Sequence, residues 1–248
     1  MDARWSAEGF MRANLHRETG PGPKRKDGKP CLPPAFSIAI SRQIGAGGSE
    51  IAREVGRRLG WKVYDRELLE EIARDMHVRV SLIEAVDERH VNWLEEFAEA
   101  FLFGSKVSEN SYVVHLVETI INLAARGQCV IVGRGGCHIL PPSCTLRVRI
   151  VAPRDDRVTS ICHERHADPK SIEHELAADE RQQARFIKDH FQRDVTDPAN
   201  YDLVLNSSRW STAECADMIV DALRELESRR ALSAAPAAAS TVSISQTA

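Results

Sequence analysis

Short apolar runs alternate with stretches of helical periodicity through the middle of the chain. We predict strands at the runs richest in β-branched residues: 36–41, 62–65, 129–133, 146–152 and 201–208. Several of these runs are too continuously apolar for a sheet with one face in water. The pattern therefore predicts an α/β fold of three layers, in which a five-stranded parallel sheet is covered by helices on both faces.

Two of the covering helices have clear signals. Apolar residues recur at helical spacing directly after the first run: Ile51, Ala52, Val55 and Leu59. The last helix is predicted to begin with a capping box, in which Ser211 and Glu214 satisfy each other's backbone amides. Its apolar face follows at helical spacing: Cys215, Met218, Ile219, Ala222 and Leu223. Both helices are expected to pack on the sheet.

The ends of the chain differ from its middle. Residues 1–34 include a stretch of Pro, Gly and Lys that is poor in apolar side chains, and we expect a disordered N-terminal extension. Residues 231–248 are mostly Ala and Ser without a periodic apolar face, and we expect a disordered tail. The folded domain is therefore expected over residues 35–230. Residues 66–126 contain helical patterns without a convincing strand, which predicts a helical insertion.

Composition excludes several classes of protein. The 248 residues include 33 basic and 36 acidic side chains, so the net charge of −3 offers no general attraction to nucleic acid or anionic lipid. No apolar stretch approaches the roughly 18 residues that span a bilayer, and no secretory signal precedes the domain, so a cytoplasmic location is expected. The six cysteines contain no CxxC pair and are expected to be reduced and structural. Oligomeric state has no signal in the sequence.

The strongest local signal is the connection from Arg42 to Ser49. Here a buried run leads through Gly45, Gly47 and Gly48 directly into a helix. Glycines allow backbone N–H groups to approach an anion, and a helix N-terminus adds unpaired donors and a positive dipole end. The alternative is a plain tight turn, because glycine also serves geometry alone. We predict a phosphate site at this turn.

Two phosphate-binding motifs compete for the turn. The dinucleotide fingerprint GxGxxG would use Gly45 and Gly47, with Asp65 at a suitable distance to bind a ribose, but it requires glycine where Glu50 stands. The P-loop pattern GxxxxGK[ST] aligns with Gly47, Gly48 and Ser49. It keeps the hydroxyl that binds magnesium and loses the lysine. Neither motif matches fully.

The segment SRQIGAGGSEIAREVGRRLGWKVYDRELLEEIA resembles the opening of the cytidylate kinase-like family of P-loop proteins, which has the same turn without the lysine. Four later segments are similar to the family in the same order: VIVGRG at 130–135, RIVAPRDDRV at 149–158, DERQQARF at 179–186 and DPANYDLVLNSSR at 197–209. The resemblance implies a P-loop NTPase fold. It also implies that the 66–126 insertion binds a monophosphate and that residues 160–192 form a helical lid.

The resemblance implies ATP and Mg²⁺ as cofactors. The donor phosphates are expected on the turn and on one lid arginine: Gln43, Gly45, Ala46, Gly47, Gly48, Ser49 and Arg165. Ser49 is the expected metal ligand, and Arg42 is the candidate replacement for the missing lysine. Arg42 is therefore expected to be catalytic.

For the acceptor, the resemblance implies Asp65, Arg66, Arg134 and Asp179, with Arg134 also catalytic. The family's acidic residue after this arginine is Gly135 here, which puts cytosine or ribose recognition in doubt. Arg181 and Arg185 share a helix face in the lid and are expected to be catalytic when it closes. The alternatives are a helix cap at Asp65 and Arg66, and surface pairing of the two lid arginines with Asp189 and Glu180.

The leading expectation is an ATP-dependent nucleoside-monophosphate kinase that transfers the γ-phosphoryl group to CMP, dCMP or a related monophosphate. Its expected partners are therefore ATP and a monophosphate. The alternative is a nucleotide-binding regulatory module with a degenerate P-loop, which Gly48 and Gly135 favour. A nicotinamide-dependent enzyme is disfavoured by Glu50.

Overall fold

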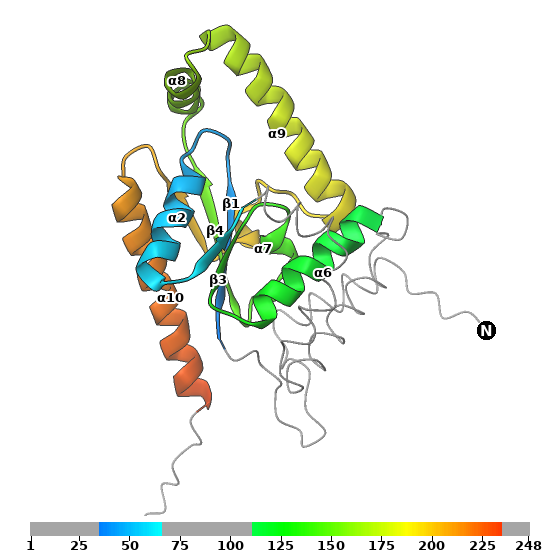
Figure 1. Cartoon of the computed structure of the whole chain (residues 1–248), viewed down its shortest axis with the longest axis vertical. Coiled ribbons are helices and arrows are strands. Elements are labelled where there is room, and N and C mark those ends of the chain that lie inside the picture. The colour runs from blue at the N-terminus through cyan, green and yellow to red at the C-terminus, as the bar shows by residue number, and fades with distance from the viewer. Residues whose placement is uncertain (1–34, 66–110, 235–248) are drawn as a thin grey trace, which may run out of the picture.

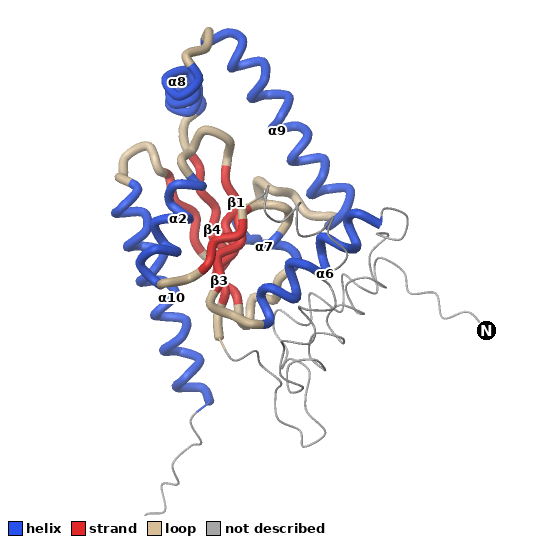
Figure 2. The backbone as a smooth tube through the Cα atoms, in the orientation of Figure 1, coloured by secondary structure: helices blue, strands red, loops and turns tan. Residues whose placement is uncertain are grey.

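The computed structural model describes residues 35–65 and 111–234. Its strands are β1 (Ser37–Arg42), β2 (Lys62–Tyr64), β3 (Cys129–Val132), β4 (Thr145–Val151) and β5 (Leu203–Asn206). They form one sheet in the order β2-β3-β1-β4-β5, and every neighbouring pair is parallel. Figure 2 shows the strands in red, with helices in blue around them. The five-stranded parallel sheet that the sequence predicts is confirmed, and each strand begins and ends within a residue or two of its predicted range.

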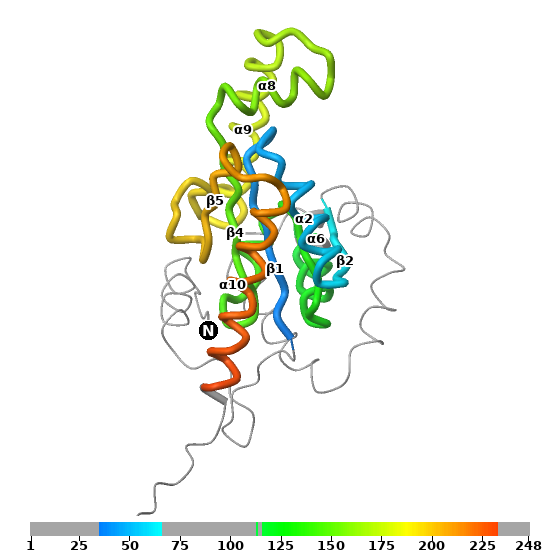
Figure 3. The backbone as a smooth tube through the Cα atoms, turned by 90° about the vertical axis from the view of Figure 1, so that its left-hand side faces the viewer, coloured from blue at the N-terminus to red at the C-terminus, as the bar shows by residue number. Residues whose placement is uncertain are grey.

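Helices cover both faces of the sheet, as expected. Figure 1 shows α2 (Gly48–Leu59) and α10 (Thr212–Ala234) on one face, and α6 (Ser111–Ala125) and α7 (Gly136–Ile139) on the other. The remaining helices are α8 (Arg154–Arg165), α9 (Pro169–Phe191) and the short 3-10 helix η1 (Pro198–Asn200). Figure 3 shows that α8 and the start of α9 extend beyond the carboxyl ends of β1 and β4. The three-layer arrangement thus places a helical pair above the end of the sheet where β1 leads into α2.

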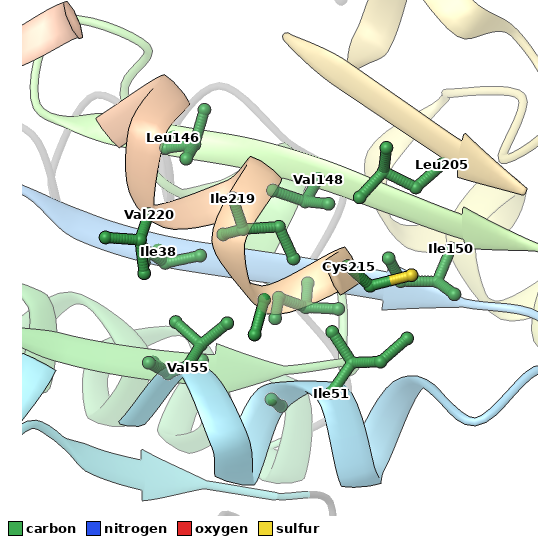
Figure 4. Packing of buried hydrophobic residues seen from close by; sticks show 14 of the residues in the cluster. Ile38, Ile51, Val55, Leu146, Val148, Ile150, Leu205, Cys215, Ile219 and Val220 are labelled. Carbon is green, nitrogen blue, oxygen red and sulfur yellow. The ribbon is translucent and has the colours of Figure 1, made fainter. Parts of the chain in front are cut away.

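The core between the sheet and the α2–α10 layer contains the apolar residues that the helical spacing of α2 and α10 predicted to face the sheet (Figure 4). Ile38 and Ile40 of β1 are almost fully buried there, against Ile51 of α2 and Ile219 of α10. The capping box is present: the Glu214 amide donates to Ser211 Oγ at 3.2 Å, and Glu214 Oε2 accepts from the Ser211 amide at 2.8 Å. The start of α10 is therefore defined by local chemistry as predicted.

The opposite face of the sheet bears polar side chains at the carboxyl ends of its central strands. Ala39 of β1 packs in the core beneath α6 and α7. Because side chains alternate along a strand, Ser41 lies on the same face as Ala39. On β4 the apolar residues Leu146, Val148 and Ile150 belong to the α2–α10 core, so Arg147 and Arg149 lie on the α6–α7 face. Two arginines of a central strand are thus directed toward the same layer as Ser41.

Helix α10 continues to Ala234, so residues 231–234, which were expected in the disordered tail, are helical. The expected N-terminal extension, the rest of the tail and most of the helical insertion lie outside the described residues, so these domain boundaries stay predictions. Within the described ranges, no helix combines the length and apolarity that would let it cross a membrane.

Candidate functional site

The connection between β1 and α2 presents a row of backbone donors. The Ala46 amide bonds to Gln43 O, and the ladder of α2 starts with the Ile51 amide on Gly47 O at 3.0 Å. The amides between them, of residues 47–50, have no acceptor among the described residues. Gly47 caps the helix with φ of +68° and supplies no side chain to satisfy them. The turn therefore offers unsatisfied N–H groups at the positive end of a helix, which suits an anion.

Neighbouring segments hold this turn in place. The Ala152 amide donates to Gln43 Oε1 at 3.0 Å, and Ser207 Oγ donates to Ala46 O at 2.8 Å. Gly45 is packed so closely that an added β-carbon would lie 2.9 Å from Arg157 O. The Gln43 side chain, predicted to bind ATP, thus uses its carbonyl oxygen to join the ends of β1 and β4. The turn is preorganised by three other parts of the chain.

Arg157 connects the turn to the α8–α9 pair. Its side chain is only 4% exposed. Nε donates to Ala152 O at 3.0 Å, and Nη1 donates to Ile44 O at 3.2 Å and to Glu180 Oε1 at 2.6 Å. One guanidinium therefore bonds the end of β4, the phosphate turn and α9. Its charge is balanced by Glu180, as a buried arginine requires.

Arg42 leaves β1 beside the turn and reaches β3. A β-carbon added to Gly48 would lie 2.5 Å from Arg42 Cβ, and one added to Gly133 would lie 2.5 Å from Arg42 Nη1. The Arg42 side chain thus passes close to Gly48 and Gly133, where a residue with a side chain would collide with it. Its guanidinium lies beside Gly133, the first residue after β3.

The turn after β3 has an unusual backbone. Gly133, Arg134 and Gly135 all have positive φ, of 79°, 48° and 80°. For the non-glycine Arg134 this conformation costs about 1–3 kcal/mol, and such strain is concentrated at functional sites. The Arg134 guanidinium lies 5.8 Å from the centre of the Phe186 ring of α9. A strained backbone thus directs an arginine at the helix that covers it.

The carboxyl ends of β1 and β3 and the facing side of α9 enclose a cavity of about 140 Å³. Its polar side chains include Ser41, Arg42, Arg134, His138, Asp179, Gln182 and Gln183. Small-molecule sites typically occupy about 300–1,000 Å³. The described residues therefore enclose room for part of a small molecule, next to the turn between β1 and α2.

The structure brings some of the predicted site residues together and leaves others apart. Arg42, Arg134 and Asp179 line one cavity, although they come from β1, the β3–α7 turn and α9. Arg181 and Arg185 are exposed on α9 and do not line it. Arg165 is exposed on α8 and pairs with Glu175 at 2.7 Å. The roles of these residues stay predictions.

The remaining predicted residues are Ser49, Asp65 and Arg66, with Glu180 as a predicted ion-pair partner. Ser49 is half-buried in the first turn of α2. Asp65 follows β2 and is the last residue of the described range 35–65. Arg66 lies outside the described residues. Glu180, expected as a surface partner of Arg181 or Arg185, instead pairs with Arg157.

Sequence reasoning did not single out Ser41, His138, Arg149 or Arg157. Arg149 is 6% exposed, and burial with three neighbouring arginines lowers the pKa of His138 to about 4. A signal for Arg149 was present, because a charged residue inside an apolar parallel strand is rarely buried without a reason. Arg157 had no comparable signal, since it reads as one of several charged residues on a helix.

A sequence model of the cytidylate kinase-like family matches residues 37–209. The chain is 26% identical over 210 residues to a cytidylate kinase of Methanopyrus kandleri, covering 78% of this chain and 98% of that protein. The crystal structure of an uncharacterized protein from Eubacterium ventriosum superposes with a TM-score of 0.61 at 20% identity, covering 77% of this chain and 98% of that one.

A gluconokinase from Sinorhizobium meliloti gives a TM-score of 0.45 at 14% identity, covering 81% of this chain and 98% of that one. The structure from E. ventriosum supports the fold. The family model spans more than two thirds of the sequence and includes the phosphate turn, the β3 turn and the α8–α9 pair. The chain therefore belongs to the cytidylate kinase-like family.

Proposed function

We propose that this protein is a kinase that transfers the γ-phosphoryl group of ATP to a nucleoside monophosphate, with CMP or dCMP as the favoured acceptors. One observation carries the proposal. The unsatisfied amides of residues 47–50 lie at the end of the strand whose last residue, Arg42, reaches into a cavity that also contains Arg134 and Asp179. Family membership and the relative from M. kandleri support the choice of acceptor.

Each part of the site has a role that its chemistry can perform. The amides of the turn bind the donor phosphates, and Arg42 supplies the positive charge that the P-loop pattern places on a lysine. Arg134 binds the acceptor phosphate, since a guanidinium can bond phosphate bidentately. Asp179 is close enough to the cavity to accept a hydrogen bond from the acceptor. Phosphoryl transfer needs this positioning and charge more than covalent chemistry.

The first turn of α2 fits a magnesium ion. Ser49 is half-buried there, within the row of unsatisfied amides of residues 47–50, and its hydroxyl is an oxygen ligand of the kind that Mg²⁺ accepts. When bound there, Mg²⁺ would supply positive charge that offsets the negative charge developing during transfer.

A regulatory module that binds nucleotide without turnover is the second candidate. It is favoured by the absence of the P-loop lysine at Gly48 and of the family's acidic residue at Gly135. It predicts ATP binding without ADP formation.

Steady-state ADP formation with purified protein, ATP, Mg²⁺ and each of CMP, dCMP, UMP, AMP and GMP tests the proposal. We expect a pyrimidine monophosphate to stimulate turnover. We also expect Arg134→Ala to lower kcat/KM by about 10- to 100-fold, as expected for one lost charged hydrogen bond. Arg53→Ala, an exposed residue of α2, is the matched control. ATP binding without turnover on any acceptor would support the regulatory module instead.

A further inference from the structure

Arg149 is a buried cation beneath the cavity. It lies on β4 directly opposite Ser41 of β1 in the sheet register, and its side chain is 6% exposed. Ser41 lines the cavity. Arg149 is therefore separated from the cavity by one small hydroxyl side chain.

The charge of Arg149 is not balanced by a carboxylate of the described residues. Its Nη1 donates to Ser41 Oγ at 2.6 Å, and its guanidinium lies 5.9 Å from the centre of the Tyr201 ring. Arg147, two residues earlier on the same face, bonds both carboxylate oxygens of Asp202 at 2.9 and 3.2 Å. Burying an unbalanced charge is costly, so a protein that keeps one is expected to gain from an anion nearby.

The hydroxyl of Ser41 is oriented for donation. Its oxygen accepts the short hydrogen bond from Arg149. The Tyr201 hydroxyl donates to Val195 O at 2.9 Å and lies farther from Ser41 Oγ, at 3.5 Å. The Tyr201 hydroxyl oxygen, at 3.5 Å, is a distant acceptor for the Ser41 proton, so a closer group in the cavity would take that proton instead, and the adjacent guanidinium makes the hydroxyl a stronger donor.

The surroundings are already positive. His138 lines the same cavity, and its pKa falls to about 4 through burial and through the charges of Arg193, Arg147 and Arg149. Its imidazole is thus neutral at pH 7. A neutral imidazole carries no charge that could offset Arg149, and the acidic residue that lines the cavity, Asp179, comes from α9 and forms no ion pair with Arg149.

We propose that Ser41 and Arg149 form the floor of the subsite for the phosphate group of the acceptor. Ser41 donates directly to a phosphate oxygen. Arg149 is a positioning residue that acts through Ser41 and supplies the counter-charge from below. The cavity of about 140 Å³ suits a phosphate group with part of its sugar. The identity of the acceptor rests on the proposed function, whereas the preference for an anion rests on the buried charge.

Binding to the full chain by calorimetry tests this subsite without requiring turnover. The ligands are CMP, cytidine and inorganic phosphate, and the variants are Ser41→Ala, Arg149→Met and Arg149→Lys. We expect Arg149→Met to weaken CMP binding about 10- to 100-fold and to leave cytidine binding unchanged. Arg149→Lys should recover part of the loss. The matched control is Arg147→Met, which changes an arginine on the same face and should keep the CMP-to-cytidine ratio.

Thermal unfolding supplies a readout that a merely structural arginine would not give. Without ligand, the Arg149→Met variant should unfold at the same temperature as the parent or at a higher one, because the substitution removes an unbalanced buried charge. Phosphate should raise the Tm of the parent and not that of Arg149→Met. Arg147→Met should have a lower Tm, because Asp202 loses both guanidinium hydrogen bonds and keeps the one from the backbone amide of residue 147.

The outcomes separate this inference from the proposed function. An unchanged CMP-to-cytidine ratio in folded Arg149→Met overturns the subsite, even if the protein is a kinase. If that variant does not fold, an unchanged ratio in Ser41→Ala overturns it equally. Phosphate binding that depends on Arg149, in a protein that phosphorylates no monophosphate, supports the subsite and refutes the kinase. A parent that binds neither phosphate nor CMP refutes the subsite.

Discussion

Arg42 and Gly48 share one space: a β-carbon on Gly48 would lie 2.5 Å from Arg42 Cβ and 2.8 Å from Cγ. Gly48 stands where the P-loop pattern has lysine. The first carbons of the Arg42 side chain therefore occupy the space that the β-carbon of any side chain at residue 48 would need. The absence of the lysine and the presence of Arg42 are linked by packing, which agrees with the expectation that Arg42 supplies the missing charge.

This relationship predicts that restoring the lysine alone is harmful. Gly48→Lys should displace Arg42 and lower kcat/KM for ATP, by about 10- to 100-fold if one charged contact is lost. Arg42→Ala should have a similar effect, and the combination Arg42→Ala with Gly48→Lys should recover part of the activity. Steady-state kinetics of the three variants measure this. A gain of turnover in Gly48→Lys alone would indicate a degenerate site.

The second prediction concerns Gly135, which takes the place of the family's acidic residue. A β-carbon there would overlap the Phe191 ring at the end of α9, and φ is +80°. Gly135→Asp should therefore lower the free energy of unfolding by about 1–3 kcal/mol through overpacking, in addition to the backbone cost. Gly60→Asp isolates that backbone cost, because φ is +68° there and nothing lies within 4 Å of an added β-carbon. Equal losses for both variants in urea unfolding would exclude a role for Phe191.

Stability should depend on pH through His138. Burial, with Arg193, Arg147 and Arg149 nearby, lowers its pKa from 6.5 to about 4. The unfolded chain binds a proton here below about pH 6.5, and the folded protein does so only near pH 4. The free energy of unfolding is therefore unaffected by His138 protonation above pH 6.5, and it decreases by about 3 kcal/mol through this residue as the pH falls to 4. Urea unfolding of His138→Gln should show a smaller decrease in that window, and the exposed His163→Gln should match the parent.

Arg157 should contribute far more to stability than Arg165, an exposed arginine of the same helix. Arg157→Met removes bonds to Ala152 O, Ile44 O and Glu180, and breaking a buried pair costs about 3–5 kcal/mol. Arg165→Met removes an exposed pair with Glu175, which is worth about 0–1 kcal/mol. Chemical denaturation compares the two. We also expect Arg157→Met to raise the KM for ATP, because Ile44 of the phosphate turn loses its anchor; an unchanged KM would contradict that link.

The cavity-facing side of α9 illustrates a signal that sequence reasoning did not use. The apolar residues Ile172 and Leu176 are buried on the side of α9 that continues through Asp179 and Gln183 to Ile187. This series has helical spacing, and Arg181 and Arg185 do not belong to it. The sequence thus contained the information that Asp179 faces the cavity and that the two arginines do not. It did not reveal the anchoring of Glu180 by Arg157, because that pair joins different helices.

The sequence by itself determined the strands, the capping box of α10 and the glycine turn, because each depends on the residues within a few positions. The glycine motifs taken alone left open whether that turn belonged to a dinucleotide fold or a P-loop fold, because both begin with a strand, a glycine turn and a helix, and the P-loop prediction rested on the family resemblance. The tertiary structure decided this through the sheet order β2-β3-β1-β4-β5, which differs from the dinucleotide-binding order 3-2-1-4-5-6. That order places Arg42 and Arg134 at one cavity, with Arg149 beneath it behind Ser41, since contacts between distant strands follow from how the strands pair and not from their spacing along the chain.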